Sequence, residues 1–210
     1  MERNEPRSTS TVRVEVDSEK SLFLSMRTQE PREVAKKLKG RNKSSSSQDS
    51  SLDEANSRDD SQSKVIEVHF DGLCEPRNPG GVATYGVVIK MDGKKIFEEC
   101  GLAEAKPWTN EASNNVAEYS ALIRGLEWLK EHDLQRHKIV LLGDSKLVVN
   151  QLNGKFKVKA PRLVELYKRA MDLIATFKDI EVKWIDRSLN SDADLLSRIA
   201  YRKYLKSTAR

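Results

Sequence analysis

The chain has 210 residues, enough for one domain of ordinary size together with a smaller segment. Hydrophobic residues make up 38% of it and charged residues 33%, a balance that suggests one buried core beside a stretch that buries little. Up to Ser63 the chain carries 12 Lys and Arg against 12 Asp and Glu, and from Lys64 onward 25 against 20. The whole surplus of +5 therefore lies in the second part, where it is weak evidence for a nucleic-acid partner.

Several classes of protein are disfavoured. Two cysteines, Cys74 and Cys100, are too few for a disulfide framework and do not match a zinc motif, so free thiols are expected. No apolar run approaches the roughly 20 residues of a membrane span. The first residues lack the apolar region of a signal peptide. We therefore expect a cytoplasmic protein, with a monomer favoured.

A serine-rich segment divides the chain. In residues 44–63, Leu52 and Ala55 are the only apolar positions, so this segment cannot bury enough surface to offset the entropy of ordering it. It is predicted to be a disordered linker between residues 1–43 and residues 64–210.

The role of residues 1–43 stays open. Val12, Val14 and Val16 alternate with charged residues as on a half-buried strand, and Pro31 suits the start of a short helix. Such a small core leaves two readings, a mostly flexible extension or a small module that docks on a protein partner.

The elements predicted from residue 64 onward begin with three strands. Lys64–Phe70 and Val82–Met91 have strand patterns, and Asp92-Gly93 predicts a tight hairpin into a third strand that runs through Cys100. A helix from about Asn115 to Glu131 follows, and its apolar stripe comprises Tyr119, Leu122, Ile123, Leu126 and Leu129.

The remaining elements alternate strand and helix. Ile139–Leu142 is a continuous apolar run, typical of a strand covered on both faces. Further elements are a short helix near Ser145, a longer one from Pro161, a strand over Ile180–Ile185 and a last helix over about Ser191–Leu205. This order predicts an α/β fold with a mixed five-stranded sheet, three antiparallel and then parallel strands, flanked by helices.

Four acidic residues occupy notable positions on these elements. Asp71 ends the first predicted strand and Asp144 the central one, and the crevice beyond the carboxyl ends of neighbouring strands is where such sheets bind ligands. Glu118 and Asp194 fall in the first turns of two predicted helices. Each acid alone is explained by a turn, a helix start or a solvated surface.

Together these acids indicate a metal site. Carboxylates that follow apolar strands repel one another at a cost that bound divalent cations relieve. Oxygen ligands with no His or Cys nearby suit Mg²⁺ or Mn²⁺ better than zinc.

Four blocks, in order from about Val65 to Tyr204, resemble type 1 ribonuclease H. They are Asp71-Gly72 with Asn78-Pro79-Gly80-Gly81, then Asn114-Asn115-Val116-Ala117-Glu118, then Gly143-Asp144-Ser145, and last Asn190-Ser191-Asp192-Ala193-Asp194. The resemblance implies a ribonuclease H-like fold over 64–210 and an endonuclease that cuts the RNA strand of RNA–DNA hybrids. Alternatives are a broader nuclease that also cuts double-stranded RNA, and a catalytically silent nucleic-acid-binding module.

The resemblance also implies the chemistry. Asp71, Glu118, Asp144 and Asp194 would hold two Mg²⁺ ions, or Mn²⁺ as substitute, about 4 Å apart, and the products would carry 5′-phosphate and 3′-hydroxyl ends.

The resemblance also implies which residues of this chain lie along the minor groove of the substrate, where the 2′-hydroxyls of RNA are recognised. They are Gly72, Asn78, Ser113, Asn114 and Asn115. Asn114 and Asn115 could instead be helix caps. Substrate contact is favoured for Asn114 and left open for Asn115.

Two departures from the family pattern stand out. Many members carry a histidine in the loop before the last carboxylate, and this chain has Arg187 there, either as a replacement that stabilises charge or as a solvated loop residue. The long basic handle of some bacterial members is reduced to Gly154–Ala160. That segment is either a short phosphate-binding handle or a solvated connection.

Overall fold

The computed structural model describes residues 64–209. The strand around Val12–Val16, the helix from Pro31 and the linker 44–63 that the sequence predicts lie outside the described residues, so the proposed division of the chain stays a prediction. Among the helices described, none is both long and apolar enough to cross a membrane.

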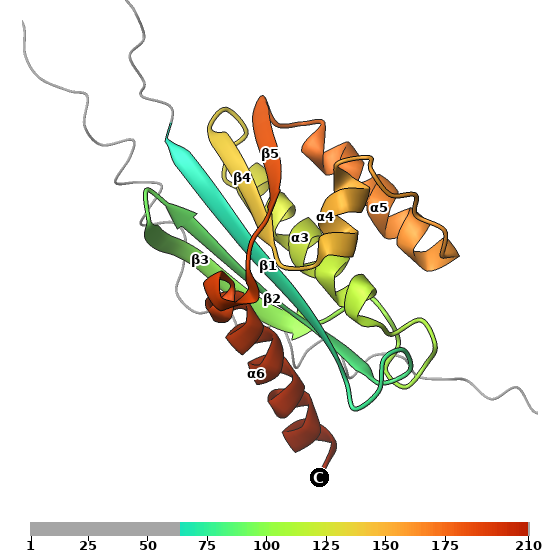
Figure 1. Cartoon of the computed structure of the whole chain (residues 1–210). Coiled ribbons are helices and arrows are strands. Elements are labelled where there is room, and N and C mark those ends of the chain that lie inside the picture. Colours follow the sequence, from blue (N-terminus) through green and yellow to red (C-terminus); the bar gives the residue numbers. More distant parts are fainter. Residues whose placement is uncertain (1–63, 210) are drawn as a thin grey trace, which may run out of the picture. The chain divides into compact units, whose positions relative to one another are not determined.

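A five-stranded sheet in the order β3-β2-β1-β4-β5 forms the centre of the fold (Figure 1). Strand β1 pairs antiparallel with β2 and parallel with β4, β3 extends the antiparallel side, and β5 extends the parallel side. The strands are β1 (Val65–Glu75), β2 (Val82–Met91), β3 (Lys94–Leu102), β4 (Lys138–Gly143) and β5 (Asp179–Trp184). The predicted mixed sheet is confirmed.

The β2–β3 connection is the predicted tight hairpin. Asp92 and Gly93 both have positive φ, 50° and 75°. Two consecutive positive φ values match the twist of the flanking strands, which is why the Asp-Gly pair was a reliable signal.

Helices cover both faces of the sheet (Figure 1). The helices α3 and α5 pack together on one face, and α6 packs on the other face against β1, β2 and β3. Helix bounds are α3 (Asn114–Glu131), α4 (Lys146–Leu152), α5 (Pro161–Ile174) and α6 (Ser191–Thr208), with a short 3₁₀ helix η2 (Arg187–Leu189) before α6.

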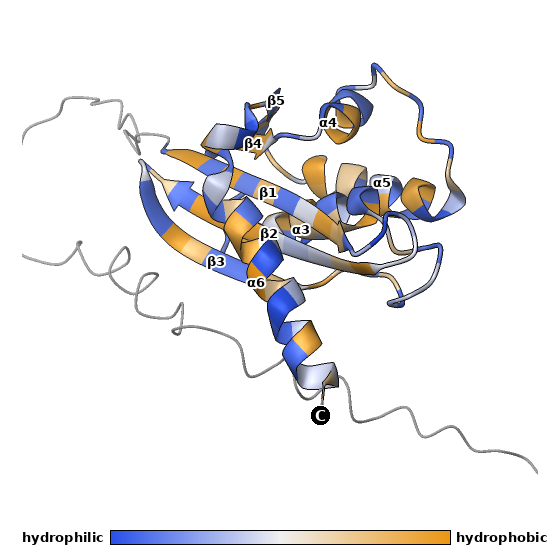
Figure 2. Ribbon diagram, turned by 60° about the horizontal axis from the view of Figure 1, so that its bottom comes forward, coloured by the Kyte–Doolittle hydropathy of each residue, from blue (hydrophilic) through white to orange (hydrophobic). Residues whose placement is uncertain are grey.

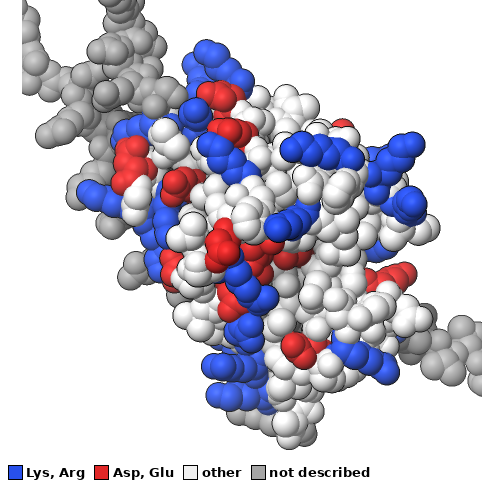
Figure 3. All heavy atoms as spheres, viewed as in Figure 1, with Lys and Arg blue, Asp and Glu red and all other residues white. Residues whose placement is uncertain are grey.

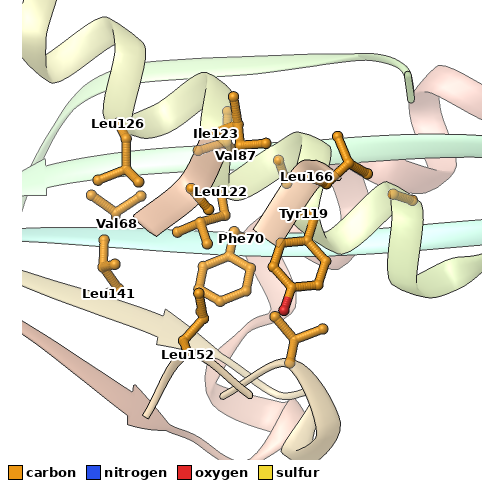
Figure 4. Close-up of a cluster of buried hydrophobic side chains, with 14 of the residues drawn as sticks. Val68, Phe70, Val87, Tyr119, Leu122, Ile123, Leu126, Leu141, Leu152 and Leu166 are labelled. Carbon is orange, nitrogen blue, oxygen red and sulfur yellow. The ribbon is translucent and has the colours of Figure 1, made fainter. Parts of the chain in front are cut away.

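The main core lies between the sheet and α3. Val68 and Phe70 of β1 meet Leu122 and Leu126 of α3, and all four side chains are fully buried (Figure 4). Burial of each such side chain contributes about 1.5–3 kcal/mol. Figure 2 shows hydrophobic and hydrophilic positions alternating along α6, as expected of a helix with one face on the sheet. All five residues of the predicted α3 stripe are buried.

Two local expectations were wrong. Strand β1 does not end at Asp71 but continues to Glu75, because its antiparallel partner β2 continues to pair with it as far as Val82. Its parallel partner stops earlier, since the β1–β4 pairing ends at Phe70 and Gly143. Asp71 is therefore the first residue of β1 that has no β4 residue beside it.

The second correction concerns Glu118. Helix α3 begins at Asn114, so Glu118 lies in the second turn and not in the first. Its position is therefore set by packing and not by the favourable end of the helix dipole, whose effect fades within the first turn.

Candidate active site

Three carboxylates meet where β4 ends. Asp71 of β1, Glu118 of α3 and Asp144, which directly follows β4, each present an oxygen within 4.8 Å of the other two. Because β4 ends early, space remains beside Asp71. Glu118 of α3 and Asp144 occupy that space. Adjacent parallel strands thus bring together residues that are far apart in sequence, as predicted for Asp71 and Asp144.

Gly72 is the reason that Glu118 reaches the cluster. A Cβ atom at position 72 would lie 2.3 Å from the backbone nitrogen of Glu118, so the α3 backbone rests directly on β1. Only glycine permits this approach. The close contact that Gly72 makes is therefore with α3, and its predicted contact with substrate stays a prediction.

The electrostatics of the cluster disfavour three negative charges. Burial, followed by the charges of Asp71 and Asp144, raises the pKa of Glu118 well above its ordinary value. Burial also raises the pKa of Asp71 to about 6, against the opposing effect of a hydrogen bond from Ser197. Without a cation these groups retain protons more readily than free carboxylic acids.

One atom of the cluster lacks a partner. Glu118 is 6% exposed, and its buried Oε2 has no hydrogen-bond partner among the described residues. A buried acceptor in this state is costly unless a ligand occupies it. An all-carboxylate set with an unpartnered oxygen suits a hard divalent cation such as Mg²⁺ or Mn²⁺.

Helix α6 fixes Asp71 from the opposite side. Ser197 Oγ donates a hydrogen bond of 2.7 Å to Asp71 Oδ2. Asn190 Nδ2 donates one of 2.9 Å to the backbone oxygen of Phe70. The sequence placed Asn190 in the fourth family block without predicting a role for it, and it predicted no role for Ser197. The available signal was Ser197 itself, a polar residue on the small-residue face of α6 that includes Ala193 and Ala200.

A tryptophan supports Asp144. Trp184 Nε1 donates a hydrogen bond of 2.9 Å to the backbone oxygen of Asp144. Lys146 Nζ lies 4.7 Å from the centre of the indole ring. The strand end that carries Asp144 is thus tied to the end of β5, a contact that the sequence pattern did not predict.

Asp194 stands beside the cluster and is held by two arginines. Its Oδ1 accepts a 2.6 Å bond from Arg187 Nη2, and its Oδ2 accepts a 2.8 Å bond from Arg198 Nε. These bonds, Arg198 first, lower the pKa of Asp194. Figure 3 shows the acidic side chains at the centre of this face with basic side chains directly beside them. Asp194 is not one of the three clustered carboxylates.

Arg187 lies between two of the acids. Besides its bond to Asp194, its Nε is 4.0 Å from Asp144 Oδ2, and 65% of its side chain is exposed. The loop arginine thus borders the cluster, where a phosphate could reach it.

The predicted substrate contacts gather around the start of α3. Ser113 is the N-cap, and its Oγ accepts a 3.3 Å bond from the Val116 amide. Asn114 and Asn115 are the first helical residues, so the interpretation of either as the cap was wrong. Asn78 Oδ1 accepts a 3.0 Å bond from the Asn114 amide, which ties the β1–β2 connection to α3.

Asn114 has a free acceptor. Its Oδ1 is buried and has no hydrogen-bond partner among residues 64–209. Among the buried side-chain atoms of the predicted substrate-contact residues, this is the one without a hydrogen-bond partner in residues 64–209.

The connection between α4 and α5 is short. Within Gly154–Ala160, Val158 packs against the core, whereas Phe156 is 51% exposed. Only one of the two apolar residues is therefore an anchor, and both interpretations of the segment stay open.

Comparison with known proteins agrees with this geometry. The family described as reverse transcriptase-like matches residues 69–200. The solved N-terminal RNase H domain of Rv2228c from Mycobacterium tuberculosis superposes with a TM-score of 0.61 at 34% identity, covering 70% of this chain and 99% of that one. The chain belongs to the type 1 ribonuclease H family.

Other relatives of this chain support the assignment to the family. Ribonuclease HI of Halobacterium salinarum is 35% identical over 135 residues, which are 64% of this chain and 63% of that protein. LC11-RNase H1, solved in complex with an RNA/DNA hybrid, has a TM-score of 0.59 at 33% identity, covering 67% of this chain and 99% of that one. Full-length Rv2228c, described as a bifunctional protein, is 39% identical over 132 residues, 63% of this chain and 34% of its own length. This chain thus spans about a third of that relative.

Proposed function

We propose that this ribonuclease H hydrolyses the RNA strand of RNA–DNA hybrids. The observation that carries the proposal is the cluster of Asp71, Glu118 and Asp144, in which one oxygen of each acid lies within 4.8 Å of the other two. Glu118 also has a buried oxygen, Oε2, without a hydrogen-bond partner among the described residues. The relative solved with an RNA/DNA hybrid supports the choice of substrate. Retention of all four expected carboxylates argues against a silent module.

The proposed cofactor is a pair of Mg²⁺ ions, with Mn²⁺ as substitute. Asp71, Glu118 and Asp144 would hold the metal, and Asp194 would join them when its arginines release it. Bound divalent cations would supply activation of water for in-line attack and stabilisation of the leaving 3′ oxygen, which gives 5′-phosphate and 3′-hydroxyl ends. Ser197 and Trp184 would keep Asp71 and Asp144 in place.

Residues at the start of α3 would read the substrate. The unpartnered Oδ1 of Asn114 is an acceptor that could take the hydrogen of a 2′-hydroxyl, the group that separates RNA from DNA. Asn78 would set the position of Asn114 through the bond to its amide. Gly72, Ser113 and Asn115 complete the proposed contact region.

Arg187 is the proposed stabiliser of charge on the scissile phosphate. Arg187→Ala should lower kcat by about a hundredfold, in the range seen when one donor to a transition-state charge is lost, and should change KM less. Arg187→Lys should recover part of the rate because it keeps the charge. Steady-state cleavage of a labelled hybrid measures both, and an alanine variant at full rate would refute the role.

The substrate preference is tested with a panel. End-labelled RNA–DNA hybrid, double-stranded RNA and DNA duplex of the same sequence are incubated with Mg²⁺, with Mn²⁺ and with chelator. Cleavage of the hybrid alone supports the proposal, and equal cleavage of double-stranded RNA would replace it by the broader nuclease. Binding of the hybrid without cleavage under any metal condition would leave only the silent module.

Removal of residues 1–63 should leave hybrid cleavage within about threefold of the full chain. Every group assigned to the site lies within residues 64–209, so the shortened chain keeps the complete cluster. Cleavage rates and circular dichroism spectra of the two chains are compared. A folded but inactive shortened chain would show that residues 1–63 take part in substrate binding or catalysis.

A further inference from the structure

A row of basic residues leads away from the site along α6. From Asp194, residues at four-residue intervals are Arg198, Arg202 and Lys206. Residues four apart lie on the same side of a helix, about 6 Å apart along its axis. The row therefore forms one strip that starts at the carboxylate of Asp194, to which Arg198 is bonded.

The outer part of this row is free for a partner. Arg202 and Lys206 are exposed, and neither forms an ion pair with any residue between 64 and 209. On the opposite face of the sheet Arg124 of α3 and Arg169 of α5 are paired with glutamates, whereas the exposed Lys130 and Lys168 form no ion pair within residues 64–209. Figure 3 shows the basic side chains of α6 gathered beside the central acidic group.

Helix stability accounts for only part of the row. A cation in the last turn is favourable there, and Lys206 occupies that turn. Arg198 and Arg202 lie further inside the helix, where this effect has faded. A solvated helix face would also be expected to mix charges, yet the row contains no acid beyond Asp194.

The negative charge of the acidic cluster opposes the binding of a nucleic acid. Asp71, Glu118 and Asp144 repel the phosphates of a nucleic acid. Basic residues outside this cluster must therefore supply most of the attraction to the phosphates. A duplex carries one negative charge per about 1.7 Å of its axis, so several phosphates lie within reach of a strip of this length.

We propose that Arg202 and Lys206, in line with Arg198, bind the phosphate backbone of the duplex next to the segment that is cut. This proposal rests on the proposed function, because the substrate is the duplex. An acidic protein segment is the competing partner, and the phosphate backbone is favoured because the row is continuous with the site that the scissile phosphate must enter.

The test measures binding apart from cleavage. Affinity of the full chain for a fluorescein-labelled RNA–DNA hybrid is measured by anisotropy in chelator, from about 50 to about 200 mM KCl. Arg202→Ala with Lys206→Ala should weaken binding at the lowest salt by roughly tenfold and reduce the slope of log affinity against log salt by about 1.8, the release expected for two phosphate contacts.

Two control pairs isolate the position of the charge. Lys130→Ala with Lys168→Ala removes the same charge from exposed positions of α3 and α5 and should leave the slope unchanged. Arg202→Lys with Lys206→Arg keeps the charge and should restore both affinity and slope. Circular dichroism shows whether α6 remains folded in each variant.

The outcomes separate this proposal from the proposed function. If both alanine pairs reduce affinity equally, or if the α6 pair has no effect on the slope, the row is not a phosphate contact and the proposal is wrong. Absence of hybrid cleavage by the unaltered chain would refute the proposed function alone, because the binding comparison in chelator does not depend on catalysis.

Discussion

Asp144→Asn is expected to lower the rate of hybrid cleavage by about a hundredfold to a thousandfold while leaving the fold intact. The substitution removes one of three clustered metal-binding carboxylates. Transition-state stabilisation by a bound metal amounts to several kcal/mol, and each 1.36 kcal/mol is tenfold in rate. The variant keeps the bond between the Asp144 backbone oxygen and Trp184 Nε1, so its structure should be preserved.

A matched control for this variant is Asp172→Asn. Asp172 is an exposed acidic residue of α5, and α5 and α6 lie on opposite faces of the sheet. Its substitution should leave the cleavage rate within about twofold. Single-turnover cleavage and thermal unfolding are measured for both variants. An Asp144→Asn enzyme that cuts at the unaltered rate would mean that the metal site has been misassigned.

Asp71→Asn is expected to stabilise the metal-free protein at neutral pH. Asp71 is 4% exposed, and burial raises its pKa from 3.8 to about 6. Because the folded state holds this proton more tightly than the unfolded state, the unaltered protein loses stability as pH rises from about 3.8 to about 6. The loss reaches about 3 kcal/mol, since one pKa unit corresponds to 1.36 kcal/mol.

The asparagine variant does not titrate, and its side-chain oxygen can still accept the bond from Ser197. Its advantage over the unaltered protein should therefore be small near pH 4, grow up to pH 6 and stay constant above it. Urea unfolding in chelator at several pH values measures this difference. A difference that is independent of pH would show that the Asp71 carboxyl group does not have the raised pKa assigned to it.

Metal should offset most of this difference in stability. A ligand at a concentration of 100 Kd stabilises a protein by about 2.7 kcal/mol, and only the unaltered protein has the complete cluster. Added Mn²⁺ should therefore raise the unfolding temperature of the unaltered protein more than that of Asp71→Asn.

The sequence predicted the features that depend on local pattern. Period-2 and helical spacing located the strands and helices, and the Asp92-Gly93 pair located the hairpin. The closeness of Asp71 and Asp144 followed from one further rule, that neighbouring parallel strands end at the same edge of a sheet.

Features that depend on distant partners could not be predicted. The length of β1 is set by β2, which pairs with it as far as Glu75. The bond from Ser197 to Asp71 joins residues 126 positions apart. The bond from Arg187 to Asp194 depends on the turn between η2 and α6, which the local pattern does not show. The bond from Arg198 to Asp194 joins residues four apart on one helix, so the spacing alone could have predicted it.

The most direct test of the central claim follows the RNA strand of an end-labelled RNA–DNA hybrid with the unaltered chain, in Mg²⁺ and in excess chelator. Cleavage of the RNA strand in Mg²⁺, absent in chelator and leaving 5′-phosphate and 3′-hydroxyl ends, is the predicted result. Cleavage that persists in chelator, or an RNA strand that stays intact with both Mg²⁺ and Mn²⁺, would contradict it.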